Sequence, residues 1–160
     1  MFAKHEAVRG AYHALFRERQ IHKQYEAVAR WRPESAYPFE HASCLQESGD
    51  FFRMGEAEGV VNSSTIVDVL EHNATWARYL LSPISGKRHQ LRVHMAALGM
   101  PLLYDSLYPQ VRPVNSGDYA QPLQLLAKSV QFVDPITQAE QQFVSQQQLL
   151  PVPEADFVWA

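Results

Sequence analysis

The order of elements in residues 63–84 most constrains what this chain can fold into. Residues 63–72 (SSTIVDVLEH) are rich in β-branched residues and predict a strand, and residues 75–84 (TWARYLLSPI) predict a second one. His72, Asn73 and Ala74 between them predict a tight turn. The two strands therefore form a hairpin, which requires antiparallel pairing.

A helix is predicted directly after this hairpin, over residues 87–98. Leu91, Met95 and Leu98 recur at steps of four and three residues and would lie on one helix face toward a core. Gly99 suits the residue that follows a helix, and Pro101 prevents its continuation.

The remaining segments predict one further helix and several short strands. These are a helix at 2–19, strands at 21–29 and within 123–134, a loop with short strands at 31–58, a surface loop at 107–123, a turn at 134–137, a short strand at 141–145 and an extended tail at 150–160. Short turns connect more of these strands than helices do. We therefore expect an α+β fold with a mixed, mainly antiparallel sheet, flanking helices and a single domain over 1–160.

Composition narrows the class of protein. The chain has 160 residues, which suits one domain, and a hydrophobic content of 46%, which allows a core. No apolar run approaches the ~20 residues of a membrane helix, and the first ten residues do not resemble a signal peptide. Cys44 is the only cysteine, so we expect it to be inert and the protein to be cytoplasmic.

Cationic side chains gather at the start of the predicted helix, although the whole chain has a net charge of -3. Lys87, Arg88, His89 and Arg92 stand where the unpaired N–H groups of a helix carry partial positive charge. This combination predicts a site for phosphate or carboxylate, in which Arg92 could hold a carboxylate in a bidentate geometry. From charge alone, a solvated helix face is the more common explanation.

Metal binding is not expected of the two histidines in this stretch. His89 and His94 are five residues apart, whereas ligands on one helix face are four apart. We expect both to be hydrogen-bonded framework residues.

The same stretch resembles the signature of the RluA-like pseudouridine synthases. That family shows Thr-Gly-Arg, one residue, and then His-Gln-Ile/Leu-Arg-Val-His. Here Ser85-Gly86-Lys87 stands for the triplet and residues 89–94 match in full. Further positions fall in register with the signature: Gly99, Pro101, Asp105 and Tyr108.

The resemblance extends over nearly all of the chain. Lys23, Tyr25 and Ala27 look like the Lys-x-Tyr-x-Ala strand of the family, and the segment LLAKSVQFVDPIT looks like its late strand. Three positions depart from the pattern. Met100 replaces a His and Leu126 stands where Leu-His-Ala is common, while Tyr104 replaces a Gly that often has a positive φ.

A fourth departure concerns the family's essential Asp, which lies in a His-Arg-Leu/Ile-Asp segment upstream of the Lys-x-Tyr strand. The six Asp of this chain, Asp50, Asp68, Asp105, Asp118, Asp134 and Asp156, do not lie in such a segment. We therefore expect the chain to be the C-terminal portion of a synthase catalytic domain, inactive alone and prone to self-association through an exposed sheet edge. Asp105 is expected to be a turn or cap residue, and Tyr108, Trp76 and Tyr79 to pack in the interior.

The resemblance implies a cofactor-free isomerisation of uridine to pseudouridine within rRNA or tRNA. In this family an Asp starts the reaction, a Tyr packs on the flipped uracil and an Arg pairs with the Asp. By this likeness Tyr25 is the base-packing Tyr, and Arg92 serves a carboxylate that the chain does not supply. The remaining cationic stretch, Lys87, Arg88, His89 and Gln90, is assigned to RNA phosphates, with no metal or membrane involved.

Two other interpretations stay open from the residues. One is a non-catalytic RNA-binding or regulatory protein derived from a synthase. The other is an unrelated α+β enzyme with a small-anion site at the basic helix start.

Overall fold

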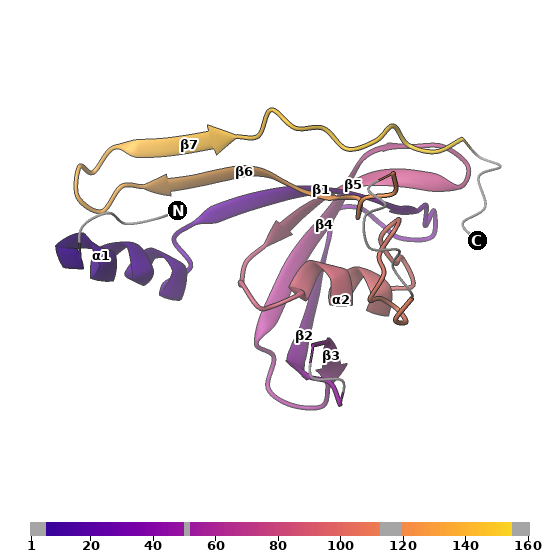
Figure 1. Ribbon diagram of the computed structural model, residues 1–160, viewed down its shortest axis with the longest axis horizontal. Coiled ribbons are helices and arrows are strands. Elements are labelled where there is room, and N and C mark those ends of the chain that lie inside the picture. The colour runs from indigo at the N-terminus through magenta and orange to yellow at the C-terminus, as the bar shows by residue number, and fades with distance from the viewer. Residues whose placement is uncertain (1–5, 50–51, 113–119, 155–160) are drawn as a thin grey trace.

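One seven-stranded sheet organises the protein. A computed structural model describes residues 6–49, 52–112 and 120–154. The strand order is β3-β2-β4-β5-β1-β6-β7, and all six pairs of neighbouring strands are antiparallel (Figure 1). The strands are β1 (His22–Arg30), β2 (Phe39–Glu47), β3 (Met54–Ala57), β4 (Ser63–His72), β5 (Trp76–Pro83), β6 (Leu125–Val133) and β7 (Glu140–Val144). The predicted α+β fold with a mainly antiparallel sheet is confirmed.

The predicted hairpin is formed by β4 and β5. The side chain of Asn73 closes its turn, because Oδ1 accepts hydrogen bonds from the backbone N–H groups of Thr75, at 2.9 Å, and Trp76, at 2.8 Å. Asn commonly bonds to the backbone two residues ahead, which explains the turn at this position. The turn predicted at 134–137 forms in the same way around Asp134, which accepts from Ile136 and Thr137.

The prediction of a loop with short strands over 31–58 was partly wrong. This segment contains β2, which has nine residues, and β3, which has four. The residues of β2 have mixed polarity, so their own preference for a strand is weak. The strand forms because β4 on one side and β3 on the other satisfy its backbone hydrogen bonds.

The predicted second helix is α2 (Gln90–Ala97), which begins three residues later than expected. His89 has a φ of 54°, in the left-handed region, and an α-helix cannot include such a residue. The predicted apolar face is confirmed, since Leu91 and Met95 are buried against the sheet. Gly99 has a φ of 75° directly after the helix, as predicted.

The main core lies between α2 and the concave side of the sheet. It contains small and large residues from β1, β4 and β5 together with residues of α2 and the segment after it: Ala27, Ala29, Val67, Ala77, Tyr79, Leu81, Leu91, Met95, Met100 and Leu102. Met100 is buried here, which explains why an apolar residue can replace the family's His. Tyr79 and Trp76 are also buried, as predicted.

The first helix, α1 (Glu6–Arg17), lies at the other end of the sheet, on the same side as α2 (Figure 1). It is attached by a small apolar cluster of Leu15, Ile21 and Phe132. A hydrogen bond of 2.8 Å from the Tyr12 hydroxyl to Asp134 adds to this attachment. The first residues of the predicted helix, 2–5, lie outside the described residues, as do 113–119 of the predicted loop and 155–160 of the predicted tail.

Neither helix in the described ranges is long and apolar enough to cross a membrane. Cys44 is buried and has a free thiol.

Candidate functional site

A cavity of about 260 Å³ opens where β1 meets the start of α2. Tyr25 of β1 and Arg92 of α2 both line it, so the structure brings together the two residues singled out as catalytic. Lys23, Lys87, His89 and Gln90 line the same cavity. The volume is near the lower end of sites for small ligands and suits a single nucleobase with its sugar.

A β-bulge lies in β6, opposite the part of β1 that borders this cavity. The register of β1 against β6 shifts between Gln24 and Tyr25, while the pairing of β1 with β5 begins at Tyr25 and Leu81. Bulges redirect side chains and are common beside functional sites. The shift against β6 falls between Lys23 and Tyr25, the two cavity residues of β1, and both side chains are only partly buried.

Arg92 has a carboxylate partner within this chain. Its Nε donates to Asp105 Oδ2 at 2.8 Å and its Nη2 donates to Asp105 Oδ1 at 2.5 Å. This partner was not predicted, and the pairing of Arg92 with the family's attacking carboxylate stays a prediction. The pair is bidentate and almost dry, with side-chain exposures of 16% for Arg92 and 0% for Asp105.

Asp105 also holds the turn in which it lies, as predicted. Its Oδ1 accepts from the backbone N–H groups of Leu107, at 2.8 Å, and Tyr108, at 3.1 Å. Tyr104, the residue before it, has a φ of 62°, so this position does require the left-handed conformation for which the family uses Gly. Sequence reasoning found the turn and missed the ion pair, because the pairing partner lies 13 residues away across the Gly99-Pro101 break.

Lys87, Arg88 and His89 precede α2 and do not lie in its first turn. Lys87 and Arg88 are exposed. Arg88 donates to Glu47 of β2 at 3.3 Å, so it does not project beside Arg92 as a common helix face would require. The RNA contacts assigned to Lys87, Arg88 and His89 stay predictions, and this mouth of the cavity is the surface on which to test them.

His89 is fixed against the ring of Tyr108. Its Nδ1 lies 3.0 Å from the Tyr108 hydroxyl, which in turn accepts from the backbone N–H of Met54 at 2.8 Å. Burial, followed by the nearby charges of Arg92 and Arg88, lowers the pKa of His89, so its imidazole is neutral near pH 7. Tyr108 is buried, as predicted, and also lies under the Arg92 guanidinium at 5.2 Å.

Gln90 is saturated by groups of the protein. Its Nε2 donates to the Ser64 carbonyl at 2.9 Å and to Thr65 Oγ1 at 3.0 Å, while its Oε1 accepts from Ser85 Oγ and the Lys87 N–H. The amide therefore connects the loop that forms the cavity mouth to β4. The RNA contact predicted for Gln90 has no free amide group to use.

His94 continues this polar network into the interior, where it is fully buried. The Ser63 hydroxyl donates to the Ser43 carbonyl, so toward His94 Nε2, 3.0 Å away, it acts as an acceptor. Nδ1 then accepts from Thr65 Oγ1 at 2.9 Å. Burial, followed by the charge of His41, lowers the pKa of His94 to about 4, consistent with a neutral framework residue.

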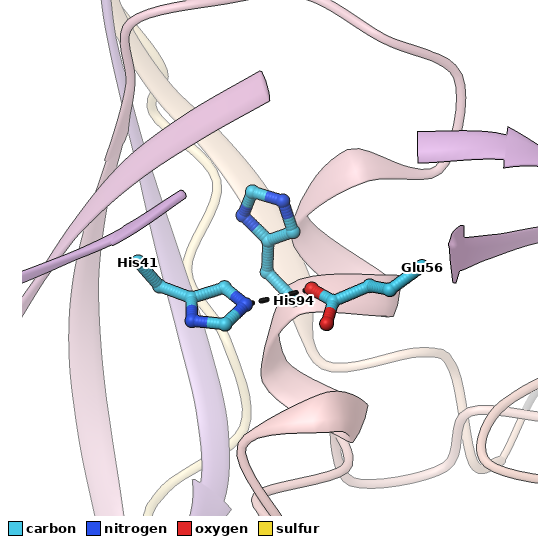
Figure 2. Close-up of side chains that lie close together, drawn as sticks. All are labelled: His41, Glu56 and His94. Carbon is cyan, nitrogen blue, oxygen red and sulfur yellow. Dashed lines mark hydrogen bonds and ion pairs between the residues drawn. The ribbon is translucent and has the colours of Figure 1, made fainter. Parts of the chain in front are cut away.

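The group most like a metal site in the described residues is His41, Glu56 and His94 (Figure 2). Their nearest ligand atoms lie within 4.8 Å of one another. A zinc ion ~2.1 Å from each nitrogen would draw them to within ~4.2 Å. Figure 2 shows the His94 ring extending away from the His41–Glu56 hydrogen bond of 2.6 Å. We interpret the group as a hydrogen-bonded His41–Glu56 pair beside a buried imidazole.

Comparison with known protein families gives one match that covers most of the site. The family model described as RNA pseudouridylate synthase matches residues 1–97, which include Tyr25 and Arg92.

Individual relatives carry related names. The chain is 31% identical over 135 residues to human RNA pseudouridylate synthase domain-containing protein 1, covering 78% of this chain and 42% of that protein. It is 37% identical over 101 residues to the dual-specificity RNA pseudouridine synthase RluA of Escherichia coli K12, covering 61% and 46%. It is 30% identical over 118 residues to human pseudouridylate synthase RPUSD2, covering 69% and 20%. The chain thus spans less than half the length of these three relatives.

A solved structure has the same fold. Human RNA pseudouridylate synthase domain containing 1 superposes with a TM-score of 0.72 at 24% identity, covering 93% of this chain and 64% of that one.

Proposed function

The chain belongs to the RNA pseudouridylate synthase family, and we propose that it forms the uridine-binding portion of a synthase catalytic domain. The observation that carries this proposal is the common cavity of Tyr25 and Arg92. These residues come from a strand and a helix 67 positions apart in the sequence, yet they line the same cavity. By the resemblance, Tyr25 packs on the flipped uracil and Arg92 pairs with the attacking carboxylate.

Tyr25 is proposed to pack on the uracil of a nucleotide flipped out of its stack. An aromatic face stabilises an unstacked base by about 1–3 kcal/mol. The cavity is too small for more than one nucleotide, so the base has to leave its helix to reach the ring.

Arg92 is proposed to orient the carboxylate that starts the reaction. A guanidinium has five N–H donors, and Asp105 uses two of them, so one edge of Arg92 stays available for a second carboxylate. Asp105 thus fixes the plane of the guanidinium and compensates its positive charge.

The RNA around the target uridine is proposed to contact the exposed cavity mouth at Lys87, Arg88 and His89. Ribosomal or transfer RNA as substrate, a cytoplasmic location and self-association at an exposed sheet edge belong to the same proposal. The outer strands β3 and β7 are the two edges available for such pairing.

The role of Tyr25 is tested by binding of a short single-stranded RNA that contains uridine. Tyr25→Ala is expected to weaken binding about tenfold, whereas Tyr25→Phe keeps the ring and is expected to bind nearly as well as wild type. The affinity is measured by fluorescence anisotropy at fixed salt. Equal binding by wild type and Tyr25→Ala would remove the assignment.

Catalysis is tested separately. No carboxylate lines the described cavity, because Asp105 is buried behind Arg92. We therefore expect this 160-residue chain alone to form no pseudouridine in ribosomal or transfer RNA, as measured by mass spectrometry of nucleosides. Formation of pseudouridine would contradict the proposal that the attacking carboxylate comes from outside the described cavity.

A further inference from the structure

Lys23 is a cation of the cavity to which no role has been assigned. Its ammonium makes one hydrogen bond within the described chain, to the Ser85 carbonyl at 3.4 Å, and no carboxylate of the described residues lies within ion-pair distance. Partial burial lowers the pKa of this ammonium. A desolvated ammonium with one long hydrogen bond has unused donors and a charge that water stabilises poorly.

Lys23 differs in this respect from the other cations near the site. The Arg92 charge is compensated by Asp105, and Arg88 pairs with Glu47. Lys87 is exposed, so water solvates it. Lys23 is therefore the partly buried cation of the cavity whose charge the described protein does not balance.

Gly86 provides the room that this ammonium occupies. A Cβ built on Gly86 would lie 3.2 Å from Lys23 Nζ, closer than ordinary contact. Gly86 does not have a positive φ, so backbone conformation does not demand a glycine here. Space for the Lys23 ammonium favours a glycine at this position.

We propose that Lys23 binds the phosphate of the nucleotide whose base packs on Tyr25. This rests on the proposed function for the identity of the base, and on the geometry of Lys23 for the anion. The two side chains leave β1 two residues apart, roughly 6.6 Å along a strand. That separation is comparable with the span of a ribose, so one mononucleotide can place its base on the ring and its phosphate at the ammonium.

The ligands for the test are uridine, uridine 5′-monophosphate, uridine 3′-monophosphate and ribose 5-phosphate, titrated at millimolar concentration into the full chain and followed by NMR chemical shifts. Wild type is expected to bind at least one of the uridine phosphates about tenfold more tightly than uridine, as expected for a charge-assisted hydrogen bond. Lys23→Met is expected to bind nucleotide and nucleoside equally.

Two further variants separate the ammonium from general charge. Gly86→Ala displaces the end of a flexible side chain and should keep the fold, and it is expected to lower the preference for the phosphate to an intermediate value. Arg17→Gln removes an exposed positive charge that does not line this cavity, and it is expected to keep the preference.

The outcomes distinguish this proposal from the proposed function. If Lys23→Met keeps the preference of wild type for the phosphate, or if wild type shows none, the assignment of Lys23 is wrong while uridine binding at Tyr25 stands. If ribose 5-phosphate binds as tightly as the nucleotide and Lys23→Met abolishes both, Lys23 is confirmed and base packing on Tyr25 is wrong.

Discussion

Two polar regions on either side of the start of α2 differ in how their groups are satisfied. The buried network, defined as Ser43, Ser63, Thr65, Gln90 and His94, pairs its hydrogen-bonding groups with one another or with backbone groups. The cavity contains Lys23 and Lys87, which lack carboxylate partners within the described chain, and Arg92, which uses two of its donors.

This difference separates structural residues from candidate binding residues within one short motif. Gln90 and Arg92 are two positions apart, and both belong to the signature that the sequence presents. The first is saturated inside the protein and the second keeps donors toward the cavity. Unused donors in a partly desolvated cavity stabilise a ligand, whereas saturated groups stabilise the fold.

The largest expected effect is that of Asp105→Ala. This variant tests whether the cavity depends on the ion pair between Arg92 and Asp105. Removing the carboxylate leaves the Arg92 charge nearly buried without a partner, which costs about 3–5 kcal/mol of folding free energy. Urea denaturation measures the change. The matched control is Glu47→Gln, which breaks the exposed pair with Arg88 and should cost at most about 1 kcal/mol. Similar values for the two variants would show that the Arg92–Asp105 pair is effectively solvated.

A smaller effect is expected of Gln90→Leu in the buried network. Leucine fills most of the space but removes one hydrogen bond from each of the four partners of the amide, at a cost of about 1–3 kcal/mol. Hydrogen exchange should also speed up in the loop of residues 85–89, which Gln90 connects to β4. Unchanged exchange in that loop would mean that Gln90 does not position the cavity mouth.

Periodicity and turn chemistry were sufficient to predict much of the sheet and the core face of α2. The hairpin of β4 and β5 could be predicted because Asn73 acts locally, and Leu91 and Met95 because helix spacing is regular. The length of β2 could not, because pairing with β3 and β4 decides it.

The candidate site could likewise be predicted only in part. Tyr25 and Arg92 could be placed in one cavity through the resemblance, since the motif fixes their relation to a common fold. The partner of Arg92 and the isolation of Lys23 depend on distances between segments, which spacing along the chain does not contain. The start of α2 also differed, because the left-handed His89 is held by Tyr108, 19 residues away.

Acid should weaken the buried network through His94. Its pKa in the folded state, about 4, is below the ordinary value near 6.5, so the unfolded chain binds a proton at a higher pH than the folded chain. The free energy of unfolding should therefore fall as the pH decreases from about 6.5 to about 4. Below about pH 4, His94 should cause no further loss. His41 and Glu56 face the same imidazole, so the comparison is made against His94→Gln, which should flatten this part of the profile. His72→Gln, at an exposed position, is the control expected to leave it unchanged.

The smallest expected effect concerns the exposed charge at the cavity mouth. Lys87→Met should weaken binding of uridine-containing RNA only a few-fold, because water solvates this ammonium in the free protein. It should lower the slope of log affinity against log salt by about 1, since one phosphate contact fewer releases one counterion fewer. The control variant is Gln90→Asn in the buried network. It removes no charge and should leave the salt slope unchanged. A loss of slope with Gln90→Asn and none with Lys87→Met would reverse the comparison, because phosphate contact would then depend on the saturated network and not on the cavity's free cations.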